Sequence, residues 1–133
     1  MSPMQEKFES LLKKFLSQKL EQHVIPVEKV KEIIVAAADL EKNTQIEEEK
    51  DIENALRELD KRFHEIHELV EVIEMEKKGK DRRVFEKFVT DIAAKLVLTD
   101  MDKALEIVTY ASEPEVTLDA FSKKYPEFLP LTV

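Results

Sequence analysis

The 133-residue chain has no cysteine, no tryptophan and a single glycine. Without cysteine there are no disulfides, thiolate metal ligands or cysteine nucleophiles. A single glycine cannot build the glycine-rich loops that cradle phosphates in Walker-type and dinucleotide-binding sites. No serine stands in the Gly-x-Ser-x-Gly elbow of hydrolases. We therefore expect no cofactor and none of these common enzyme chemistries.

Long apolar runs are also missing. No stretch approaches the ~18 consecutive apolar residues that a membrane-spanning helix needs. The first residues are followed by charged helical sequence instead of the apolar run of a signal peptide. Together with the lack of cysteine, this leads us to expect a cytoplasmic protein without a membrane partner.

Charge is abundant and uneven. Charged residues make up 38% of the chain and the net charge is −8, whereas average domains are roughly 25% charged. Residues 44–78 hold twelve acids against six bases, so most of the negative charge lies there. Such a surface repels phosphate backbones, which disfavours a nucleic-acid partner and favours a protein partner.

The same region predicts one long helix. Thr44 and Glu47 have the spacing of a capping box, and Gly79 follows two lysines where a left-handed C-terminal cap is wanted. These signals predict a helix of about 35 residues over 44–78, roughly 52 Å long. Its apolar residues follow coiled-coil spacing: Ile52, Leu56, Leu59, Phe63, Ile66, Val70 and Ile73.

The rest of the chain predicts shorter helices over 3–22, 27–42, 82–98, 100–112 and 117–124, followed by an apolar tail over 125–133. Pro26 interrupts the first pair, and Asp81, Asp100 and Thr117 are candidate N-caps. The helices over 3–22 and 27–42 together are about as long as the long helix, and so are the helices over 82–98 and 100–112. The chain is therefore predicted to be one all-α domain, an antiparallel bundle around a long central helix, flanked by two broken helix pairs and a short C-terminal helix.

Two surfaces are candidates for binding a partner. The apolar stripe of the long helix widens toward its C-terminal half, and three columns of helices leave one face uncovered, which predicts a homodimer. The tail either docks on its own bundle or is recognised by a partner. The candidate partner-binding residues are Leu69, Val72, Met75, Phe128 and Leu129.

The long helix also carries the only histidine pair. Two imidazoles and two carboxylates at helical spacing could converge on a divalent metal. A complete site would need further ligands from a facing helix. The candidate ligands are His64, His67, Glu68 and Glu71.

Arg62 and His67 are separated by four residues. This spacing resembles the Arg-x4-His element of HEPN-type RNases, which are small dimeric helical bundles. The resemblance implies that Arg62 stabilises phosphate charge and that His67 performs acid–base catalysis. It covers these two residues only, and Phe63 stands where that family usually carries a polar residue.

The basic cluster over 77–83 is the one strongly positive patch and could dock an acidic partner. On balance the sequence predicts a non-enzymatic helical-bundle protein that acts through protein–protein interaction, as an adaptor, chaperone-like protein or regulatory subunit. The alternative is a metal-binding bundle or a HEPN-like RNase.

Overall fold

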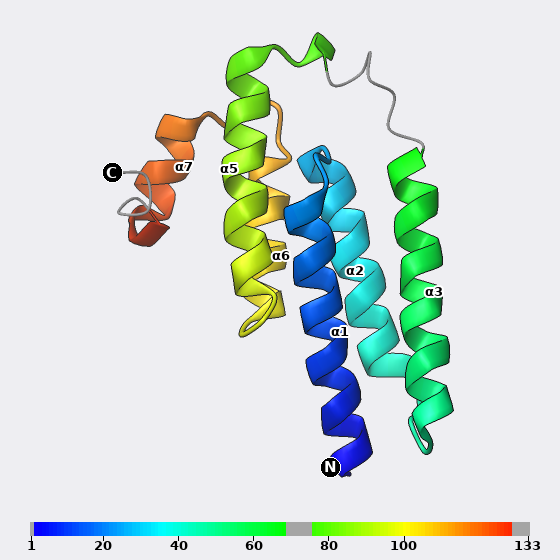
Figure 1. Cartoon of the computed structure of the whole chain (residues 1–133). Coiled ribbons are helices and arrows are strands. Elements are labelled where there is room, and N and C mark those ends of the chain that lie inside the picture. Colours follow the sequence, from blue (N-terminus) through cyan, green and yellow to red (C-terminus); the bar gives the residue numbers. More distant parts are fainter. Residues whose placement is uncertain (1, 69–75, 129–133) are drawn as a thin grey trace.

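The structure is a computed structural model that describes residues 2–68 and 76–128. These residues form an all-α bundle of six helices without a strand. The helices are α1 (Pro3–Gln22), α2 (Val27–Asn43), α3 (Glu49–Glu68), α5 (Lys80–Leu96), α6 (Met101–Ala111) and α7 (Leu118–Lys124). Figure 1 shows the α1–α2 and α5–α6 hairpins side by side, with α3 at one edge and α7 at the other.

Three helices begin at a capping side chain, and two of these caps, Asp100 and Thr117, were predicted. The side chains of Ser2, Asp100 and Thr117 each accept a hydrogen bond from a backbone N–H in the first turn of the helix that follows. These bonds satisfy donors that the first helical turn leaves unpaired. Asp81 does not cap α5, because that helix begins two residues earlier than predicted, at Lys80 after Gly79.

The predicted 35-residue helix is wrong, because α3 has 20 residues. Thr44 does not start a helix; its N–H donates to the Leu40 carbonyl and closes α2. The helix begins at Glu49 because the Asp51 carboxylate reaches back to the N–H groups of Glu47 and Glu48. This is the reciprocal half of a capping box, displaced from the predicted one, and it holds the pKa of Asp51 below its usual range.

Gly79 was predicted to be the C-terminal cap of the long helix, and its conformation in the structure is different. Its φ is 82° and its ψ is 161°, a combination that is essentially restricted to glycine. This is not the left-handed helical conformation expected for a C-terminal cap. Gly79 instead turns the chain into α5, so the need for glycine was predicted correctly and its role was not.

The predicted long helix is not the centre of the bundle. Helix α2 contacts α1, α3, α5 and α6, and α5 contacts α1, α2 and α6, whereas α3 packs mainly on α2 and also on α1. The reason is the width of the apolar surface. Helix α3 buries a single stripe, whereas α5 buries two adjoining faces, formed by Phe85, Glu86, Val89, Thr90, Ile92, Ala93 and Ala94. The predicted broken pairs are also hairpins and do not lie end to end along α3 (Figure 1).

Small residues allow α1 to approach α5 closely. Ser17 is buried in α1, and its hydroxyl donates a 2.6 Å hydrogen bond to the Ala94 carbonyl of α5. Ala93 and Ala94 are fully buried beside it. A larger side chain on this face would separate the two hairpins.

Candidate functional site

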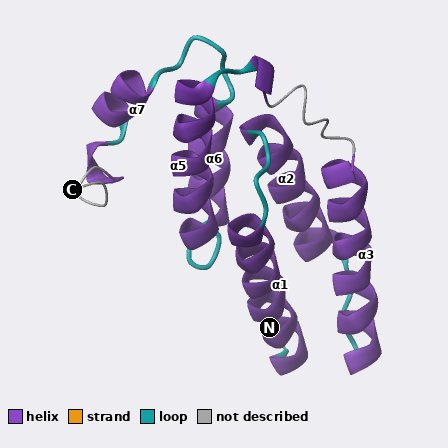
Figure 2. Ribbon diagram, turned by 45° about the horizontal axis from the view of Figure 1, so that its top comes forward, coloured by secondary structure: helices purple, strands orange, loops and turns teal. Residues whose placement is uncertain are grey.

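An apolar groove lies between α5 and α7. Its volume is about 490 Å³, and Figure 2 shows the two helices that border it from a second direction. The apolar residues that line it are Val84, Phe85, Pro114, Val116 and Leu118, with Asp81, Arg82, Thr117 and Asp119 among the polar ones. We call this the α5–α7 groove.

Two aliphatic side chains on this groove face solvent. Val84 is 58% exposed and Leu118 is 46% exposed, and they are two of the five large hydrophobic side chains that are exposed among the described residues. Single exposed hydrophobic residues are common on protein surfaces, but an exposed pair beside an apolar groove marks a candidate contact site. The sequence analysis singled out neither residue, because apolar residues within a predicted amphipathic helix are expected to face the core.

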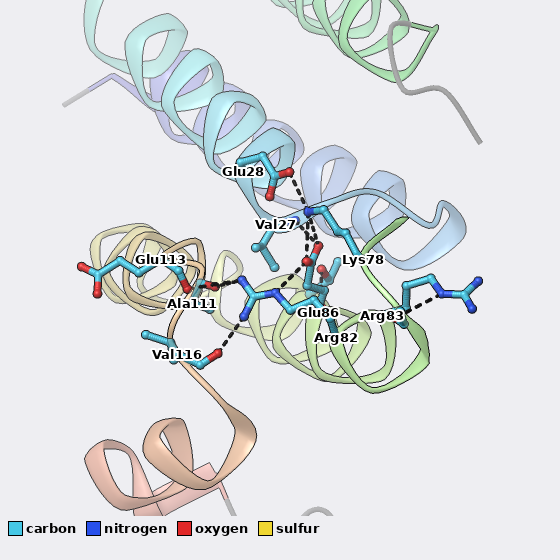
Figure 3. Close-up of polar contacts among 11 residues, drawn as sticks. Val27, Glu28, Lys78, Arg82, Arg83, Glu86, Ala111, Glu113 and Val116 are labelled. Carbon is cyan, nitrogen blue, oxygen red and sulfur yellow. Dashed lines mark hydrogen bonds and ion pairs between the residues drawn. The ribbon is translucent and has the colours of Figure 1, made fainter. Parts of the chain in front are cut away.

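Arg82 fixes one wall of the groove. Its guanidinium donates to the carbonyls of Val116 at 2.7 Å and Ala111 at 2.6 Å, as Figure 3 shows. These carbonyls lie at the end of α6 and in the connection to α7. Arg82 therefore fixes the α6–α7 connection against α5, through charge-assisted hydrogen bonds.

Glu86 is the buried centre of this network. Its side chain is only 2% exposed. One oxygen accepts from the Val27 N–H at 2.9 Å, and the other accepts from the Arg82 Nε at 3.0 Å. Because Val27 begins α2, the carboxylate also satisfies a free donor and the positive end of that helix dipole. Glu86 thus links the α1–α2 hairpin to α5 through Val27, and it does so next to Arg82, which fixes the groove wall.

Lys78 completes the network from the other side. Its ammonium donates to Glu86 at 3.0 Å and to Glu28 at 2.6 Å (Figure 3). Burial raises the pKa of Glu28, but the hydrogen bond from Lys78 and the neighbouring positive charges outweigh it, so the pKa lies below its usual value. Two bases of the predicted acidic-partner patch, Lys78 and Arg82, are therefore engaged within the chain, whereas Lys77, Lys80 and Arg83 are exposed.

An aromatic cluster joins α7 to the bundle. Phe121 is buried, and its ring lies 5.7 Å from Phe85 of α5 and 6.4 Å from Tyr110 of α6, between centroids. Phe128, a predicted partner-binding residue, is partly buried and stacks on Phe121 at 6.5 Å. The other predicted partner residues, Leu69, Val72, Met75 and Leu129, lie outside the described residues.

Tyr125 fixes the chain just after α7. Its hydroxyl donates a 2.9 Å hydrogen bond to Glu106 of α6. Burial and this bond to a carboxylate raise the pKa of Tyr125 to about 12, while hydrogen bonds from Lys103 and Tyr125 lower the pKa of Glu106. Residues 125–128 are therefore anchored on α6 and α7.

A second groove, of about 600 Å³, lies between α2 and α3. We call it the α2–α3 groove. Arg62, the candidate catalytic arginine, lines it, and so does Val35, which is 38% exposed. Four carboxylates line the same groove: Glu28, Glu32, Asp39 and Glu65. This acidic surrounding favours pairing of Arg62 with carboxylates over binding of an RNA phosphate.

The remaining candidate ligands are only partly described. His64 is exposed on α3. His67 and Glu68 belong to α3, but their side chains, and the whole of Glu71, lie outside the described residues. The described part of the chain contains no group of three or more histidine, aspartate or glutamate side chains that could hold a metal ion. The metal site and the Arg62–His67 pair therefore stay predictions.

Comparisons with protein-family models, with curated proteins and with solved structures found no match to this chain. None of the helices in residues 2–68 and 76–128 is long and apolar enough to cross a membrane.

Proposed function

We propose that this chain is a protein-interaction module that binds an apolar segment of another protein in the α5–α7 groove. The observation that carries the proposal is the exposure of Val84 and Leu118 beside an apolar groove. Aliphatic anchors that leave water on binding supply much of the affinity of protein interfaces. The groove volume also falls in the range of roughly 300–1,000 Å³ that is typical of ligand pockets.

The groove wall is formed before a partner binds. Arg82 bonds the connection between α6 and α7, and the aromatic contacts of Phe121 hold α7 in place. A partner would therefore pay little conformational entropy to order this surface, which favours binding. Such a surface suits an adaptor, a chaperone-like protein or a regulatory subunit, and it requires no catalytic group.

The homodimer is a separate proposal. It rested on an uncovered apolar face of the long helix, but Ile52, Leu59 and Phe63 of α3 are buried by the chain's own α1 and α2. Only Leu69, Val72 and Met75, outside the described residues, still argue for a second copy. Light scattering at micromolar concentration tests it: a dimer predicts twice the chain mass of 15.5 kDa.

The interaction proposal can be tested with a displayed library of random peptides selected against the full chain. Val84→Asp/Leu118→Asp places two charges beside the groove without changing a buried residue. We expect the selected peptides to be rich in aliphatic residues and to bind this variant at least tenfold more weakly than the parent chain.

The matched control is Val35→Asp, which adds a charge at an exposed valine of the α2–α3 groove. The selected peptides should bind this variant as tightly as the parent chain. Equal binding to the parent and to Val84→Asp/Leu118→Asp, or a selection that yields no binders, would overturn the proposal.

A further inference from the structure

The chain continues beyond the described residues with an apolar segment. Residues 129–133 are Leu-Pro-Leu-Thr-Val, four aliphatic or proline residues and one threonine without a charge. Aliphatic side chains of this kind match the lining of the α5–α7 groove, where Val84, Val116 and Leu118 lie. Left in water, they would expose apolar surface that the groove can cover.

The point from which this segment starts is close to the groove. The Phe128 ring lies 6.5 Å from the Phe121 ring, which lies 5.7 Å from the Phe85 ring on the groove wall. The distance between the Phe128 and Phe85 ring centroids is therefore no greater than the sum of these two distances. Five extended residues span up to about 17 Å, which is enough to enter the groove.

A surface path leads in the same direction. A shallow depression along α7 is lined by Leu118, Asp119, Ser122, Lys123 and Pro126. It shares Leu118 and Asp119 with the α5–α7 groove. The depression and the groove thus adjoin at Leu118 and Asp119, and the depression also reaches Pro126, just before the tail.

From this juxtaposition we propose that residues 129–133 bind in the α5–α7 groove of their own chain. The consequence of this binding rests on the proposed function. A bound tail occupies the surface that a partner needs, so the tail and the partner compete for the groove. The tether keeps the tail at an effective concentration in the millimolar range, so even weak apolar contacts hold it there. Only a partner with higher affinity, or one that captures the tail itself, displaces it.

The absence of cysteine makes a direct test simple. Val84→Cys/Thr132→Cys places one thiol beside the groove and one on the tail. In a mild oxidant we expect a disulfide within one chain, visible as a faster-migrating monomer on a non-reducing gel. Its rate of formation reports how often the tail lies at the groove.

Two controls separate docking from simple proximity. Adding Leu129→Ser/Leu131→Ser to the same pair keeps the tether and removes the apolar contacts, and we expect disulfide formation to slow at least tenfold. Val35→Cys/Thr132→Cys places the groove thiol in the α2–α3 groove, across the bundle, and should react at least as slowly.

Three results would overturn the inference: a rate unchanged by the serine substitutions, a rate as high for Val35→Cys/Thr132→Cys, or a disulfide formed mainly between two chains. The last result would assign the groove to the tail of a second copy. No partner takes part in this experiment, so its outcome is independent of the peptide selection, and the two proposals fail separately.

Discussion

Each of the two grooves contains one arginine, Arg62 in the α2–α3 groove and Arg82 in the α5–α7 groove. Arg62 is exposed among four carboxylates, whereas Arg82 is largely buried and donates to backbone carbonyls and to Glu86. The first groove is therefore a charged, solvated surface, and the second is an apolar surface on a fixed wall. Groove volume alone does not distinguish the two surfaces, whereas the bonding partners of their arginine side chains do.

The largest expected difference is between the two arginines. Arg82→Ala leaves buried carbonyls unpaired and removes a partner of Glu86, so we expect the free energy of unfolding to fall by about 3 kcal/mol. Arg62→Ala should change it by no more than about 0.5 kcal/mol. Urea denaturation followed by circular dichroism measures both.

Arg82→Lys sharpens the same comparison if the alanine variant does not fold. Lysine keeps the charge beside Glu86 but cannot reach both carbonyls, so an intermediate loss of about 1–2 kcal/mol is expected. Equal losses for Arg62→Ala and Arg82→Ala would mean that Arg82 does not fix the groove wall.

The next effect concerns the tail. Deletion of residues 129–133 should tighten binding of the library-selected peptides by about fivefold, or about 1 kcal/mol, because the peptide no longer competes with the tail. Isothermal titration calorimetry of the full and shortened chains measures this. Weaker binding after deletion would show that the tail supports the partner site and does not cover it.

A smaller effect concerns Glu28, which lines the α2–α3 groove but bonds Lys78 of the network. Its pKa is lowered in the folded chain, so its stabilising contribution is present above the unfolded-state value of 4.5 and is lost as pH falls through the folded-state pKa. Glu28→Gln should cost less than about 1 kcal/mol at pH 7.

Urea denaturation at pH 7 and pH 3 measures this pH dependence. At pH 3 the parent and Glu28→Gln chains should differ less than at pH 7. A difference that stays constant between these values would contradict an electrostatic role for Glu28.

The smallest effect should come from Glu41, which lines neither groove. Burial, together with Glu9 and Asp102, raises its pKa, against the opposing charge of Lys13. The folded chain thus favours the protonated form, and ionised Glu41 opposes folding at neutral pH. Glu41→Gln should stabilise the fold by a few tenths of a kcal/mol at pH 7. The gain should shrink as pH falls toward 4.5, and thermal denaturation at both pH values tests it.

The sequence predicted elements with local signals and failed where tertiary contacts decide. The helices that begin after Asp100 and Thr117 were predicted because the capping side chain and the apolar stripe lie within a few residues of each other. The first helix was predicted from its apolar stripe, and its Ser2 cap is seen in the structure. The start of α3 was misplaced because acids abound over 47–51 and several of them fit a capping pattern. Only Asp51 bonds the backbone there.

The polar network was not predicted because its members are far apart in the sequence. Arg82 and Glu86 have the i, i+4 spacing of an ordinary surface ion pair, and nothing local in the sequence shows that Glu86 meets Val27. One signal was available. Glu86, Thr90 and the small residues Ala93 and Ala94 form a second stripe beside the main one, as expected for a helix that is covered on two sides.

Amide NMR spectra of the labelled full chain, with and without the tightest-binding selected peptide, show whether apolar segments bind at the α5–α7 groove. We expect shifts centred on Val84, Phe85, Val116 and Leu118. Shifts centred on Val35 and Ile66 in the α2–α3 groove, with the α5–α7 groove unchanged, would contradict this expectation.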